Sequence, residues 1–98
     1  MRFVFHGLDH PGAGDLRARH RAAHRDYHDG RGNPVGGPLL DPEGDPCGTL
    51  IVLEAEDADA AARVMAQDPY VVAGLFAHTS LLPFRAIDWP VDDRRDGS

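Results

Sequence analysis

The sequence predicts a single α+β domain in which two helices pack on one face of an antiparallel sheet. The chain has 98 residues, which is enough for one domain and too few for two. Segments typical of strands and of helices follow one another in the order β-α-β-β-α-β. Nothing in the sequence repeats. Residues 91–98 are charged and we expect them to be flexible, so the predicted domain covers residues 1–90.

The first half of the chain contains the strand, helix and strand that open this order. Residues 2–6 alternate around Phe3 and Phe5 and are typical of a strand. After a glycine-rich loop, a helix is predicted over residues 16–28, with Asp15 as its cap. A second strand, weakened by its own glycines and proline, is predicted over residues 34–40.

The second half supplies two further strands and the second helix. Thr49–Ala55 (TLIVLEA) is nearly continuous in β-branched and aliphatic residues and is the clearest strand. Apolar positions at i, i+3, i+4 and i+7 predict a helix over residues 58–67, which Pro69 ends. Residues 70–76 are typical of a short helix, and residues 78–87 of a last strand. The resulting order is that of the ferredoxin-like fold, which leaves one sheet face uncovered, so we expect a dimer.

The composition excludes several classes of function. A formal net charge of −6 argues against nucleic acid and anionic membranes as partners. No apolar stretch approaches the roughly 20 residues of a membrane span, and the N-terminus is not typical of a secretory signal, so we expect a cytoplasmic protein. Cys47 is the only cysteine, which excludes an intrachain disulfide. All ten basic residues are arginine, which excludes Schiff-base chemistry through lysine.

The predicted first helix carries the residue on which chemistry would centre. Leu16, His20, Ala23 and Tyr27 lie at i, i+4, i+7 and i+11, so they form an apolar stripe from which His20 points inward. An inward imidazole is either a hydrogen-bonded structural histidine or an acid/base group tuned by its surroundings. The pattern alone favours the structural interpretation.

His24 and His28 share the spacing i, i+4, i+8 with His20. Two histidines one turn apart can chelate a metal ion, but each step of four residues drifts around the helix, so three rarely point at one spot. Because arginine and aspartate residues surround His24 and His28, we expect both on a solvated face. Metal binding through His20 and His24 is therefore the less favoured alternative.

Asp68 is the most notable carboxylate of the sequence, because it lies between the end of the second helix and Pro69. The structural interpretation is a turn aspartate, since Asp-Pro is common in turns. The functional interpretation is an aspartate at the mouth of a cleft, which orients an imidazole or takes a proton itself.

Short motifs in a fixed order connect the chain to a known family. They are Asp9 after the first strand, the Arg-x-x-His element Arg17-Ala18-Arg19-His20, Gly37-Pro38, Asp68-Pro69-Tyr70, Ala73-Gly74-Leu75 and Pro83-Phe84. In their order and spacing they resemble the YciI-like, or YCII-related, proteins over nearly the whole chain. No single motif is specific, and the combination carries the resemblance.

The resemblance implies a dimeric α/β barrel with an active site built on a histidine and an aspartate, which would be His20 and Asp68. It implies no metal and no cofactor. Substrate-binding roles are implied for Asp9, Arg17, Gly37, Pro38 and Tyr70. We therefore expect a lyase or isomerase that acts on a small molecule by acid/base chemistry. The alternative is a non-catalytic dimer that binds a metabolite or supports another enzyme.

Overall fold

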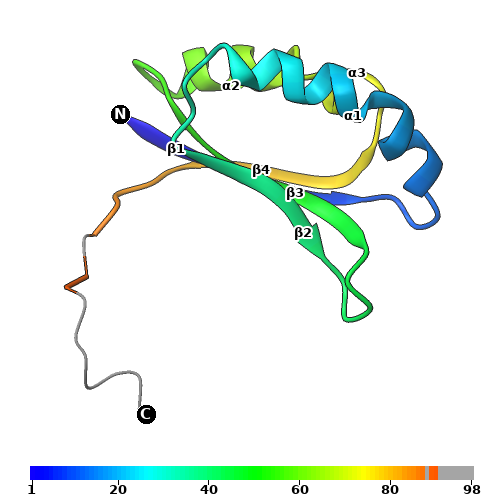
Figure 1. Ribbon diagram of the computed structural model, residues 1–98. Helices are drawn as coiled ribbons and strands as arrows, with labels where there is room; N and C mark the ends of the chain where they lie inside the picture. The colour runs from blue at the N-terminus through cyan, green and yellow to red at the C-terminus, as the bar shows by residue number, and fades with distance from the viewer. Residues whose placement is uncertain (88, 91–98) are drawn as a thin grey trace.

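The chain folds into a four-stranded antiparallel sheet with helices on one of its two faces (Figure 1). The computed structural model describes residues 1–87, 89 and 90. In chain order the elements are β1 (Arg2–Asp9), α1 (Gly14–Asp29), β2 (Val35–Leu40), β3 (Pro46–Glu54), α2 (Ala58–Ala66), α3 (Pro69–Val72) and β4 (Phe76–Pro83). The predicted α+β class and the order β-α-β-β-α-β are confirmed, with α3 as a short additional helix.

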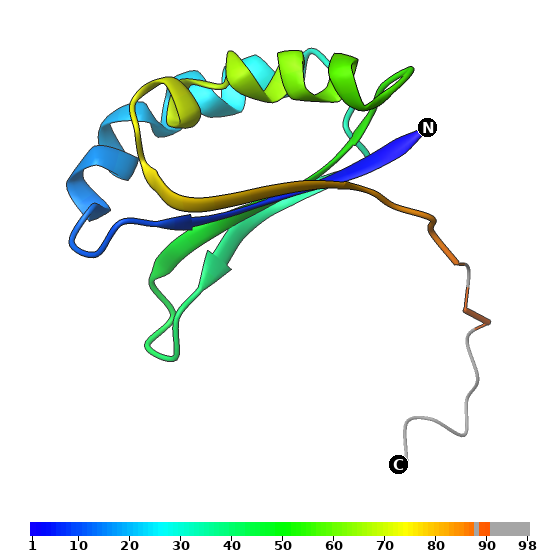
Figure 2. The same ribbon diagram turned by 180° about the vertical axis from the view of Figure 1, so that it is seen from behind.

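The sheet has the order β2-β3-β1-β4, so the two most apolar strands lie in its centre. Phe5 of β1 lies opposite Ile51 of β3 and Leu81 of β4, and this row of side chains points to the helices. Figure 2 shows the arrangement from behind, with α1, α2 and α3 together on one side and, in the part of the chain that the structure describes, no helix on the other. Side chains therefore alternate between a covered and an uncovered face.

The core lies between the centre of the sheet and α2. Its buried cluster consists of Phe3, Phe5, Ile51, Leu53, Ala61 and Met65. The second helix is fixed at its start by Asp57, whose side chain accepts a hydrogen bond of 2.8 Å from the backbone N–H of Ala60. This core holds α2 firmly over the sheet.

Several element boundaries differ from the sequence prediction. β1 continues to Asp9 rather than ending at residue 6, and β3 begins at Pro46, because both strands find hydrogen-bonding partners beyond their apolar centres. α1 has Ala13 at its N-cap position without a side-chain bond, so Asp15 lies inside the first turn and is not the cap. β4 ends at Pro83 rather than residue 87. The charged end predicted over residues 91–98 lies outside the described residues.

Within the part of the chain that the structure describes, no helix is both long and apolar enough to cross a bilayer.

Candidate active site

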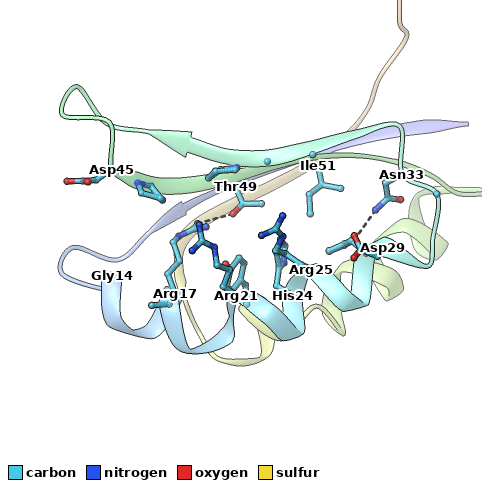
Figure 3. A pocket seen from close by; sticks show the side chains of 18 residues that line it. Gly14, Arg17, Arg21, His24, Arg25, Asp29, Asn33, Asp45, Thr49 and Ile51 are labelled. Carbon is cyan, nitrogen blue, oxygen red and sulfur yellow. Dashed lines mark hydrogen bonds between the residues drawn. The ribbon is translucent and has the colours of Figure 1, made fainter.

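A cavity of about 880 Å³ lies between α1 and the strands β2 and β3 (Figure 3). On the helix side it is lined by Arg17, Arg21, His24 and His28, which lie at i, i+4, i+7 and i+11 and so share one helix face. On the sheet side it is lined by residues of the covered face, among them Gly36, Pro38, Thr49 and Ile51. The cavity is therefore built from one helical stripe and two strands.

Asp68 anchors two histidines of this stripe. It lies at the N-cap of α3, where its Oδ1 accepts a hydrogen bond of 2.8 Å from the backbone N–H of Tyr70. His24 Nδ1 lies 2.9 Å from Oδ1 and 3.0 Å from Oδ2, and His28 Nε2 lies 2.9 Å from Oδ2. The side chain of Asp68 is completely buried, so these contacts replace the water that a free carboxylate would bind.

The hydrogen bonds assign different roles to the two histidines. His28 Nδ1 lies 2.9 Å from Nδ2 of Asn33, which donates, so the opposite nitrogen, Nε2, carries the proton toward Asp68. Both nitrogens of His28 are thereby occupied. His24 donates from Nδ1 to Asp68, and none of the described residues hydrogen-bonds its Nε2. Of the two rings, His24 is the one with a nitrogen available to accept a proton.

Tyr70 fixes the plane of the His24 ring. The two rings stack with centroids 4.0 Å apart and an interplanar angle of 17°. Tyr70 is buried, and the guanidinium carbon of Arg17 lies 4.8 Å from the centre of its ring. The His24 side chain is thus constrained by a carboxylate at one nitrogen and by an aromatic face along its length.

Arg17 and Asp9 form a buried ion pair at one end of the cavity. Arg17 Nε donates to Asp9 Oδ2 at 2.7 Å and Nη2 donates to Oδ1 at 2.8 Å, while Nη2 also donates to Thr49 Oγ1 at 2.9 Å. The side chains of Arg17 and Asp9 are only 9% and 8% exposed. Burial lowers the pKa of Arg17, but the hydrogen bond and charge of Asp9 outweigh it and raise the pKa above its ordinary value. The guanidinium therefore stays charged.

Among the substrate-binding residues implied by the resemblance, Arg17, Gly37, Pro38 and Tyr70 line the cavity. Asp9 is absent from the cavity wall and instead holds Arg17 in place.

The expected pairing of His20 with Asp68 is not found in the structure. His20 is partly buried and is not part of the cavity wall, whereas His24 and His28, which we expected on a solvated face, have side chains only 13% and 11% exposed. The physical reason is the rotation of α1. The stripe that contains His20 includes Tyr27, whose hydroxyl donates to the backbone carbonyl of Val64 in α2 at 2.6 Å. Tyr27 of that stripe therefore contacts α2, and the stripe one residue further along lines the cavity.

One signal in the sequence points to His24. The spacing Arg-x-x-His occurs three times in α1, as Arg17–His20, Arg21–His24 and Arg25–His28. The motif therefore has three possible registers, and the contacts of Asp68 with His24 and His28 exclude the first of them.

His24, His28 and Asp68 are also the described residues that could hold a metal ion, since their ligand atoms lie within 4.8 Å of one another. A tetrahedral ion with bonds of about 2.1 Å keeps its ligand atoms about 3.4 Å apart. The nitrogen-to-oxygen distances of 2.9 Å are shorter and are typical of hydrogen bonds. The donor set fits a proton-sharing network better than a metal centre.

The charge of Asp68 makes stability depend on pH. Burial acts to raise the pKa of Asp68, but the hydrogen bonds from His24, His28 and the Tyr70 backbone outweigh it and lower the pKa from 3.8 to about 2. A carboxyl group with a lowered pKa stabilises the folded chain above its unfolded pKa, and this contribution is lost as pH falls through the folded pKa. The relevant window is therefore pH 4 to 2, and the contribution is about 2 kcal/mol.

We expect Asp68→Asn to remove the pH-dependent contribution of Asp68 to the free energy of unfolding. The difference in the free energy of unfolding between wild type and variant should be largest above pH 4 and shrink by about 2 kcal/mol toward pH 2. Urea unfolding at a series of pH values measures it. A difference that stays constant across the window would contradict the pairing of a charged Asp68 with the two histidines.

Comparison with known proteins places the chain among relatives of known fold. Residues 1–85 match the family of YCII-related domains. The 5-chloro-2-hydroxyhydroquinone dehydrochlorinase TftG from Burkholderia phenoliruptrix AC1100, in complex with 2,5-dihydroxybenzoquinone, is 32% identical. That match has a TM-score of 0.80 and covers 87% of this chain and 94% of TftG. No protein of curated function matches the chain.

Two more distant structures share the fold alone. An antibiotic biosynthesis monooxygenase is 12% identical with a TM-score of 0.56, and the match covers 89% of this chain and 98% of the other. The protein PA3566 from Pseudomonas aeruginosa is also 12% identical, with a TM-score of 0.54 and coverage of 88% and 93%. The fold is that of the dimeric α/β-barrel proteins, as the family resemblance implied.

Proposed function

The chain belongs to the YCII-related domain family, and from this premise we propose that it is a small-molecule lyase or isomerase whose base is His24. The observation that carries the proposal is the contact between His24 Nδ1 and Asp68. His24 lines the cavity, and its Nε2 has no hydrogen-bonding partner among the described residues. These side-chain contacts form the arrangement that a histidine base requires, because a carboxylate sets the tautomer and stabilises the charged ring.

The proposed reaction begins with transfer of a substrate proton to Nε2 of His24. In the elimination of chloride from a chlorinated hydroxyhydroquinone, one hydroxyl loses its proton and becomes a carbonyl while the ring carbon that carries chlorine takes up a proton. Loss of a second hydroxyl proton then forms the other carbonyl, and chloride departs with the electron pair of the C–Cl bond. In an isomerisation, the same imidazolium returns the proton to another carbon. Asp68 stabilises the imidazolium, and His28 and Tyr70 are positioning residues. Proton transfer of this kind contributes about 100- to 10,000-fold to the rate.

The similarity to TftG supports a small ring as the substrate. TftG is a dehydrochlorinase of a chlorinated hydroxyhydroquinone, so its reaction is an elimination. The cavity of about 880 Å³ lies within the usual range of small-molecule sites, roughly 300–1,000 Å³.

The first test is an activity assay of the wild-type protein. We expect release of chloride from 5-chloro-2-hydroxyhydroquinone, or exchange of a ring proton with deuterated solvent in unchlorinated hydroxyhydroquinone. Chloride is measured by ion chromatography and exchange by mass spectrometry. Binding of these compounds without either reaction would favour the alternative, a non-catalytic metabolite-binding or accessory dimer.

We also propose that the uncovered sheet face joins two copies of the chain. Val35, Val52, Val4 and Leu82 are register neighbours and form one aliphatic row across all four strands. Val35 is 58% exposed and Leu82 is 63% exposed, although both are large apolar residues. A second copy would bury this row. The cytoplasmic location stays a prediction of the sequence.

Leu82→Arg should convert this proposed dimer to a monomer, because burial of an unpaired charge next to this apolar row is costly. Sedimentation velocity measures the change in mass. Val72→Arg is the control, since Val72 is equally apolar and 73% exposed but lies on α3 above the other face. A wild-type monomer, or the same effect from both variants, would contradict the proposed interface.

A further inference from the structure

We infer that the cavity takes an anionic ring compound, and that Arg21 and Arg25 hold its ionised hydroxyl or carboxylate group. This inference rests on the proposed function, because it names the substrate class of the same site. It is carried by the distribution of charge along α1, where Arg17, Arg21 and Arg25 lie at i, i+4 and i+8 and all line the cavity. Figure 3 shows the side chains of these arginines and of His24 extending from α1 toward the sheet.

The three arginines differ in what they contact. The charge of Arg17 is used within the protein, because Asp9 and Thr49 occupy its guanidinium. Among the described residues, no carboxylate lies within 4.0 Å of a side-chain nitrogen of Arg21 or Arg25. Both are exposed, and both remain available to a ligand.

The acidic residues of the cavity do not cancel these charges at close range. Asp29 and Asp45 also line the cavity, but they lie toward its opposite ends (Figure 3). The chain as a whole has a formal net charge of −6. The positive charge of Arg21 and Arg25 on one cavity wall is therefore opposite in sign to the net charge of the protein. This local charge favours an anion at the centre of the cavity.

Tyr70 does not serve as the counter-anion. Burial raises the pKa of Tyr70 above its ordinary value, although the charges of Arg17 and Arg21 act in the opposite direction. The phenol therefore stays neutral at physiological pH and leaves the charge of Arg21 to the ligand.

The wall opposite the arginines suits a flat ring. Gly36 lies on the covered face of β2, and a Cβ atom there would come within 3.5 Å of the Ile51 side chain. Because glycine has no side chain, no side chain projects into the cavity from position 36, between Pro38 and Ile51. A ring that lies against it would present its edge to α1, where the arginines and Nε2 of His24 are found. Guanidinium groups bind carboxylate-like oxygen pairs through two parallel hydrogen bonds.

The test compares two probes that differ in charge. 2,5-Dihydroxybenzoquinone is an anion at neutral pH, whereas 2,5-dimethoxybenzoquinone has the same ring and no ionisable group. Isothermal titration calorimetry should show the anion binding at least about tenfold more tightly. Arg21→Gln and Arg25→Gln should each weaken binding of the anion about tenfold and leave the dimethoxy compound unaffected. Arg63→Gln, on α2 and outside the cavity, should bind as the wild type does.

Equal affinity for both probes, no binding of either, or unchanged binding by both arginine variants would overturn the inference. The His24→Gln variant separates it from the proposed function. If that variant loses turnover while the arginine variants bind the anion normally, the function stands and the anion site does not. If the arginine variants lose binding while His24→Gln keeps full turnover, the anion site stands and His24 is not the base.

Discussion

Replacing His24 by glutamine is expected to lower kcat/KM by about 100- to 10,000-fold and to leave the fold intact. The glutamine amide can still donate a hydrogen bond to Asp68, whose carboxylate lies 2.9 Å from Nδ1 in the wild type. It cannot accept a proton from the substrate, because an amide is not a base at neutral pH. Chloride release or proton exchange measures the loss of activity, and thermal unfolding confirms that the variant is folded.

The matched control is His20→Gln. His20 lies one turn earlier on the same helix, is partly buried and is absent from the cavity wall. We expect its turnover to stay within about threefold of the wild type, the usual scale of a change that removes less than 1 kcal/mol. The reverse result, with His20→Gln inactive and His24→Gln active, would restore the pairing that the sequence motif first suggested and contradict the assignment made from the structure.

Arg17→Met is expected to lower the free energy of unfolding by about 3–5 kcal/mol. Methionine replaces much of the volume of the arginine but leaves the Asp9 carboxylate, only 8% exposed, without its two charged hydrogen bonds. Thr49 Oγ1, which is also buried, loses its donor in the same variant. Urea unfolding monitored by circular dichroism measures the change.

An exposed ion pair of the same sheet provides the control. Arg2 Nε lies 2.8 Å from Glu54 Oε1, but the two side chains are 43% and 53% exposed. Water can solvate Glu54 when its partner is removed, so Arg2→Met should have little effect on stability. The double variant Arg17→Met/Asp9→Leu should recover part of the loss, because it removes the unpaired carboxylate. Equal losses of unfolding free energy from Arg17→Met and Arg2→Met would show that burial of the Arg17–Asp9 pair does not determine its contribution to stability.

The fold could be predicted because each strand and helix is specified by a pattern of neighbouring residues in the sequence. The run Thr49–Ala55 alternates poorly but is rich in β-branched residues, and it forms most of the central strand β3. The spacing of Ala61 and Met65 places both on the buried face of α2. The sequence pattern could not predict where β1 ends and where β3 begins, because partners in neighbouring strands set these two boundaries.

The site was predictable only in part, because its contacts are not local. The Asp-Pro-Tyr motif led to Asp68 and Tyr70, and the structure places both beside the cavity stripe of α1. The histidine was misassigned because the apolar stripe of α1 and its cavity stripe are offset by one residue. His24 is separated from Asp68 by 44 positions in the chain. No pattern of neighbouring residues predicts a contact over this distance in the sequence. Polar neighbours such as Arg25 and Asp26 indicated a solvated face instead.

The proposed base depends on one structural feature: Asp68 holds His24 at Nδ1, and Nε2 stays available to take a proton. The most direct test is ¹⁵N NMR of the histidine rings, assigned with the His20→Gln, His24→Gln and His28→Gln variants. With both rings uncharged, we expect His24 to carry its proton on Nδ1 and His28 to carry its proton on Nε2. A His24 ring protonated on Nε2 would contradict it, because no nitrogen would then be available to take the substrate proton.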